Sequence, residues 1–96
     1  MASQVLGEQR IAAAALAAAV APTLPAGTRY ALLSADTAPI RFTLDGATTP
    51  TATVGLRLLI TEPPYRLTLE MGLAEVKFIL ESGSPNLYLV YCGDPN

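Results

Sequence analysis

The chain has 96 residues, of which 51% are hydrophobic and 15% are charged, with a net charge of −2. This length suits a single domain. The six basic residues are scattered singly, whereas binding to nucleic acid or to an anionic membrane usually needs a clustered basic patch. The composition therefore argues against both partners. Charge well below the roughly 25% typical of soluble domains indicates either an alanine-filled β core or surface that is buried against other subunits.

The residues that usually carry catalysis or bind metals are scarce. Histidine is absent and Cys92 is the single cysteine, which excludes histidine-activated nucleophiles, ordinary zinc sites and an intrachain disulfide. No glycine-rich phosphate-binding motif is present. We expect no catalytic residue, metal, cofactor or small-molecule substrate. An enzyme would need a carboxylate pair that converges in space, drawn from the eight acidic residues Glu8, Asp36, Asp45, Glu62, Glu70, Glu75, Glu81 and Asp94.

The N-terminal region divides into two parts. Residues 1–10 are polar and predict a flexible arm that precedes one domain over residues 11–96. Eight of the eleven residues from Ile11 to Ala21 are alanine, which favours a helix, but the run lacks a helical apolar period, so extended structure packed on a sheet is the preferred interpretation. The run is too short for a membrane span of about 20 residues. Glu8 argues against a secretory signal, although Ala19-Val20-Ala21 is similar to a cleavage site.

From Gly27 onward the hydrophobic pattern predicts strands. Apolar residues alternate with polar ones or form short continuous runs, and Asp45-Gly46 is a strong tight-turn signal. Residues 48–53 contain Pro50 and suit an exposed loop or an edge strand. The last expected strand is apolar on both faces, which indicates a central or covered position. The six expected strands are 29–34, 40–44, 56–60, 65–70, 75–80 and 87–92.

Strands separated by turn signals roughly every 8–12 residues predict an all-β chain. The expected fold is a small β-sandwich, immunoglobulin-like or jelly-roll-like, with about six to eight short strands. Two groups of side chains on these strands could serve binding. Four tyrosines could form a platform that binds carbohydrate or peptide, although packing within the sandwich is the preferred interpretation. Four basic residues are expected on the solvent side of the strands, where they could pair with acidic residues of a neighbouring subunit. These residues are Tyr30, Tyr65, Tyr88 and Tyr91, and Arg41, Arg57, Arg66 and Lys77.

The segment from Tyr30 to Tyr91 resembles small virion proteins of tailed bacteriophages. The resemblance lies in Ala31-Leu32-Leu33, in residues 39–46 and 49–55, in Glu75-Val76-Lys77-Phe78-Ile79 and in the closing Leu87-Tyr88-Leu89-Val90-Tyr91. The chain departs from that pattern at Thr61-Glu62-Pro63-Pro64 and in its alanine run. Residues 40–46 with Thr49-Pro50-Thr51 are also similar to a hairpin of immunoglobulin-like accessory domains in chitinase-type enzymes, apart from one inserted residue. Both likenesses imply an immunoglobulin-like sandwich.

The first resemblance implies a non-enzymatic capsid decoration (cement) protein. Such a subunit would be made in the host cytoplasm, lie on the capsid surface of the virion, and bind the major capsid protein and copies of itself as a homo-oligomer. The alternative hypothesis is a carbohydrate- or receptor-binding module at the virion surface or in a tail fibre. That function would require a row of exposed aromatic rings.

Overall fold

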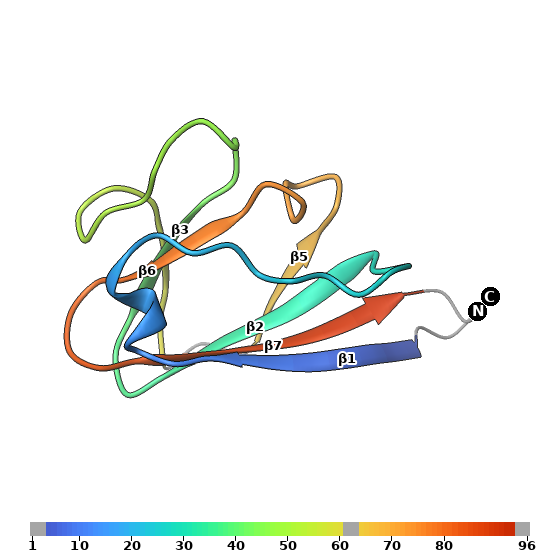
Figure 1. Ribbon diagram of the computed structural model, residues 1–96, viewed down its shortest axis with the longest axis horizontal. Coiled ribbons are helices and arrows are strands. Elements are labelled where there is room, and N and C mark those ends of the chain that lie inside the picture. Colours follow the sequence, from blue (N-terminus) through green and yellow to red (C-terminus); the bar gives the residue numbers. More distant parts are fainter. Residues whose placement is uncertain (1–3, 61–63, 94–96) are drawn as a thin grey trace.

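A computed structural model describes residues 4–60 and 64–93 of the chain (Figure 1). Sequence expectations that fall on residues 1–3, 61–63 and 94–96, including Glu62 and Asp94, lie outside this range. The described residues form seven strands and one short 3-10 helix. These are β1 (Gln4–Ile11), η1 (Ala15–Ala17), β2 (Tyr30–Asp36), β3 (Ile40–Thr43), β4 (Leu56–Leu58), β5 (Tyr65–Thr68), β6 (Lys77–Leu80) and β7 (Asn86–Gly93).

The strands form two antiparallel sheets that pack face to face. The four-stranded sheet has the order β1-β7-β2-β5 and the three-stranded sheet has the order β4-β3-β6. In Figure 1 the long strands β1, β7 and β2 lie side by side along the bottom, and β3 and β6 lie above them. The expected small all-β sandwich is confirmed. β7 lies between β1 and β2, the central position that its two apolar faces predicted.

Period-two alternation builds the core between the sheets. Ile40 and Phe42 of β3 are buried while Arg41 between them is not, and Leu87, Leu89 and Tyr91 of β7 are buried together. The expected strand boundaries shift at the turns: β4 ends at Leu58 and β5 at Thr68, before the expected ends. The remaining core residues are Ile11, Leu16, Ala31, Leu33, Ala35, Leu58, Leu67, Leu73, Val76 and Phe78.

The expected flexible arm over residues 1–10 is wrong from Gln4 onward. These residues form β1, which pairs antiparallel with β7 from Gln4 opposite Gly93 to Ile11 opposite Leu87, with a register shift between Val5 and Gly7. A polar segment suits this position because one face of an edge strand is solvated. The partner of this segment is β7, which the sequence pattern did not reveal and to which β1 is joined by backbone hydrogen bonds.

The alanine-rich run is neither one helix nor one strand. Ile11 ends β1, η1 makes a single turn that buries Leu16, and the backbone is extended again at Ala18. Val20 then forms an isolated antiparallel bridge with Phe78 of β6, with N···O distances of 2.9 and 2.8 Å. Farther on, the backbone N–H of Thr23 donates to Gln9 Oε1 on β1 at 3.1 Å. The run therefore joins β1 to β6 and covers the core edge between the two sheets.

Candidate functional site

The loop between β3 and β4 is held in one conformation by its own polar side chains. Asp45 Oδ1 accepts from the backbone N–H groups of Ala47 and Thr48 at 3.0 and 2.8 Å, and Oδ2 accepts from the Thr48 hydroxyl at 2.7 Å. Gly46 adopts a φ of +73°, which glycine reaches without steric cost. The Thr48 hydroxyl and these two amides lower the pKa of Asp45. The turn that the sequence predicted at Asp45-Gly46 is confirmed, but it begins a long loop and does not form a two-residue hairpin.

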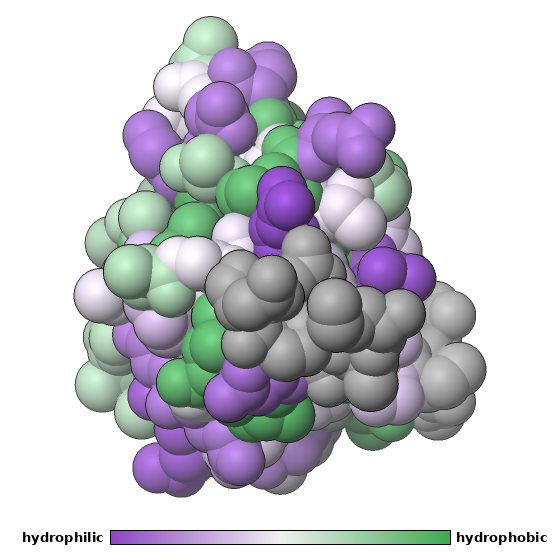
Figure 2. Space-filling model, turned by 90° about the vertical axis from the view of Figure 1, so that its right-hand side faces the viewer, coloured by the Kyte–Doolittle hydropathy of each residue, from purple (hydrophilic) through white to green (hydrophobic). Residues whose placement is uncertain are grey.

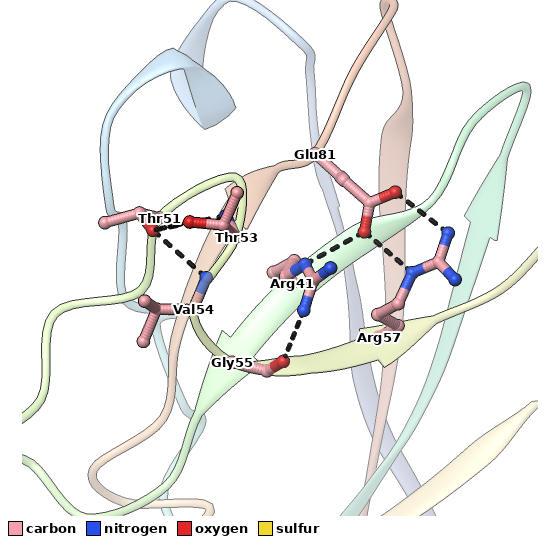
Figure 3. Close-up of polar contacts among 7 residues, drawn as sticks. All are labelled: Arg41, Thr51, Thr53, Val54, Gly55, Arg57 and Glu81. Carbon is pink, nitrogen blue, oxygen red and sulfur yellow. Dashed lines mark hydrogen bonds and ion pairs between the residues drawn. The ribbon is translucent and has the colours of Figure 1, made fainter.

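The second half of this loop is a compact turn that starts at Thr51. Its hydroxyl accepts from the backbone N–H groups of Thr53 and Val54 at 3.2 and 3.0 Å (Figure 3). Gly55 follows with a φ of +126°, and a Cβ there would stand 2.9 Å from the carbonyl oxygen of Phe42. Only glycine fits this close approach of the loop to β3. The turn therefore holds the Val54 side chain out at the surface.

An open hollow of about 360 Å³ lies between this loop and the adjoining strands. We call it the loop-side depression. Val54 and Leu56 lie beside it with 44% and 53% of their surface exposed. Phe42 is one of its lining residues, and the Phe42 ring packs against Tyr65 in an edge-to-face pair with centroids 5.6 Å apart. The lining residues are Phe42, Thr43, Leu44, Asp45, Thr48, Val54, Gly55 and Leu56. Such a hollow suits an apolar side chain of a partner.

An ion-pair cluster on the outside of the three-stranded sheet anchors the strand that borders the depression. Glu81 Oε1 accepts from Nε of Arg41 at 2.9 Å and from Nε of Arg57 at 2.7 Å, and Glu81 Oε2 accepts from Arg57 Nη2 at 2.9 Å (Figure 3). Arg41 Nη1 also donates to the Gly55 carbonyl oxygen at 2.9 Å. The hydrogen bond from Arg57 lowers the pKa of Glu81. Both arginines, which we considered for pairing with a neighbouring subunit, therefore bind within their own chain.

The four tyrosines occupy different surroundings. Tyr91 is buried and burial raises its pKa to about 12, and Tyr65 packs on Phe42. The Arg66 guanidinium lies 4.2 Å above the ring centroid of Tyr30. Tyr88, at 42% exposure, donates its hydroxyl proton to Glu8. Of these four residues only Tyr88 is exposed, so they do not form the row of open aromatic rings that a carbohydrate platform needs.

Large hydrophobic side chains are exposed at several further places. On the side of the molecule drawn in Figure 2, hydrophobic residues lie between hydrophilic ones. The exposed large hydrophobic residues of the described chain are Val5, Val54, Leu56, Ile60, Leu69, Met71 and Tyr88. Sequence reasoning missed Val54 and Leu56 as surface residues, because Leu56 shares the strand pattern of a core position.

The remaining chemistry-bearing residues are dispersed. Within residues 4–60 and 64–93, no three or more acidic or cysteine side chains are grouped as a metal site would require, and no helix has the length and hydropathy of a membrane span. Cys92 is a buried free thiol, near a strand end as expected. The comparison with protein-family models, curated proteins and solved structures finds no match for this chain.

Proposed function

We propose that the chain is a non-enzymatic structural subunit of a virion, a capsid decoration protein that binds the outer face of the major capsid protein. One observation carries the docking site: Val54 and Leu56 stand exposed beside the apolar loop-side depression, on a loop stiffened by Asp45 and Thr51. A preformed surface loses little conformational entropy when it docks. Burying apolar area contributes about 25 cal/mol per Å².

The resemblance to small virion proteins of tailed bacteriophages supports the capsid as the partner. In this role the work is mechanical: subunits bridge capsomers and oppose the outward pressure of packaged DNA. Identical contacts repeat around a symmetric shell, so a modest affinity at each contact suffices through multivalency. The role needs no nucleic acid, membrane or small-molecule substrate.

The test is co-sedimentation of the purified chain with phage heads that lack it. Replacing Val54 and Leu56 together by serine should weaken head binding at least about tenfold, because the central apolar contacts of an interface dominate its affinity. Leu69→Ser is the matched control, since Leu69 is 41% exposed and does not line the depression. It should bind like the unmodified chain.

Two results would count against the proposal in different ways. If the unmodified chain does not sediment with heads at any concentration tried, the decoration role is wrong. If the chain binds but the serine double variant binds equally well, the role stands and the loop-side depression is not the docking surface. Thermal unfolding of each variant shows whether a binding defect reflects loss of the fold.

A further inference from the structure

The outward side of the four-stranded sheet carries a regular array of side chains. Residues paired across antiparallel strands share a face, so the registers define each row. One row runs Glu8–Val90–Leu32–Arg66 across β1, β7, β2 and β5. The neighbouring rows are Val5–Cys92–Tyr30–Thr68 and Arg10–Tyr88–Ser34. We call the side chains of these three rows the outer sheet face.

The centre of the outer sheet face is apolar. Leu32 and Val90 are only half-buried there, and Tyr88 is exposed. The outward side of the other sheet is more highly charged, since Arg41, Arg57 and Lys77 occupy it beside Thr43 and Ile79. An antiparallel sheet with one solvated face normally turns polar residues outward. The apolar centre of the outer sheet face therefore indicates a surface that another molecule covers.

The charges on this face are arranged for a second copy of the same chain. Glu8 and Arg66 stand at opposite ends of the central row, three strand spacings or about 14 Å apart. Each is held over the face by a tyrosine: Glu8 accepts from the Tyr88 hydroxyl, and Arg66 lies over the Tyr30 ring. The other charged groups, Arg10 in the third row and Asp36 at the end of β2, lie toward one end of the face.

We infer that two copies of the chain pack through their outer sheet faces, around a two-fold axis that runs along the strands. This axis places β1 of one copy over β5 of the other, so Glu8 meets the partner's Arg66 twice. It also places Leu32 over the partner's Val90, in the aligned stacking of sheets about 10 Å apart. The inference concerns the isolated protein and does not depend on the proposed capsid role. The loop-side depression contains none of these residues and stays free.

The size of the face sets the expected strength of the dimer. Four strands of about six residues cover about 400 Å² on each copy, so the dimer buries about 800 Å² in total, which is below the roughly 1,200 Å² of a stable specific interface and is typical of a weak, transient contact. We therefore expect a weak, reversible dimer with a dissociation constant on the order of 100 µM to 1 mM. Sedimentation velocity between about 10 µM and 1 mM should show a reversible shift from monomer to dimer.

Charge exchange at the two ends of the central row tests the geometry. E8R sets two arginines against each other at both contacts and R66E sets two glutamates, so each variant alone should dimerise at least about tenfold more weakly. An equimolar mixture of E8R and R66E restores an opposite-charge pair at both contacts and should form a heterodimer. The double variant E8R/R66E should recover self-association in the same way.

Matched controls separate this contact from an effect of net charge. E70R and K77E make the same charge changes at positions outside the outer sheet face and should leave dimerisation unchanged. Leu32→Thr keeps a strand-forming residue and removes the central apolar contact, so it should weaken the dimer without altering charge. A chain that stays monomeric up to 1 mM, single variants that dimerise like the unmodified chain, or a mixture that fails to associate would each overturn the inference. If Leu32→Thr abolishes binding to heads in a chain that is always monomeric, the capsid protein covers this face instead.

Discussion

Glu81 forms ion pairs with two arginines of the three-stranded sheet. Arg41 and Arg57 lie directly opposite each other on β3 and β4, and like charges in that position destabilise a sheet. The Glu81 carboxylate, which follows β6, accepts hydrogen bonds from both. One anion thus turns a repulsive pair into a link between three strands.

Acid should weaken this link in a defined direction. Arg57, with Arg41, holds the pKa of Glu81 below its ordinary value of 4.5 in the folded chain. A carboxyl group with a lowered folded-state pKa stabilises the fold above its unfolded pKa, and this contribution disappears as the pH falls through the folded value. Glu81→Gln should therefore be less stable at pH 7 and should lose less stability than the unmodified chain when the pH is lowered below 4.5. Thermal unfolding from pH 7 to pH 3 measures this, with exposed Glu70→Gln as the control. Parallel acid curves for Glu81→Gln and the unmodified chain would contradict it.

The short helix η1 and the segment after it act as a cover for one side of the sandwich. Leu16 of η1 is fully buried in the common core, and Val20 adds an antiparallel bridge to the edge of β6. This bridge occupies backbone groups that an edge strand would otherwise present to other chains. A three-residue helix is too short to be stable through its own hydrogen bonds, so burial of Leu16 holds it in place.

Leu16→Ala should lower the free energy of unfolding by about 2–5 kcal/mol, because it removes a fully buried leucine and leaves a cavity. Leu69→Ala, the same change at an exposed position, should cost less than about 1 kcal/mol. Urea denaturation followed by circular dichroism measures both. Equal costs for the two variants would show that η1 does not contribute to the core.

At the scale of the whole molecule, the N-terminal segment completes the sandwich. β1 protects the outer edge of β7, and Ile11 at its end belongs to the core. A truncation of the residues before Arg29 would remove any contact that this segment makes with a capsid. That change would also delete β1 and η1, so it would damage the fold before it tested docking.

Deletion of residues 1–11 should abolish cooperative unfolding or cause aggregation, because β7 would become an exposed, largely apolar edge. Urea denaturation and light scattering measure the two outcomes. A synthetic peptide of residues 4–11 added in trans should restore the folded signal, since an extended peptide can add to a free sheet edge. A deletion variant that unfolds cooperatively at the same urea concentration as the full chain would show that β1 is dispensable.

Local pattern alone was enough to predict six of the strands and the central place of β7. Alternation of period two reports which side of a strand avoids water, and Asp45-Gly46 reports a turn whose hydrogen bonds are local. Both signals depend on residues a few positions apart, so they can be recognised in the sequence without knowledge of the fold.

Only the tertiary structure decided the features that depend on distant partners. β1 is polar and looks like a loose arm until β7, some 80 residues away in sequence, supplies its hydrogen bonds. The sequence alone places Arg41 and Arg57 in solvent, and only the fold brings Glu81 to them. Leu56 has the sequence pattern of a core residue, but β4 is an edge strand in the folded chain. The same holds for the loop-side depression and the outer sheet face, because each joins side chains from separate strands. The physical reason is that the cost of closing a chain loop between such partners is met by contacts that no short window of sequence contains.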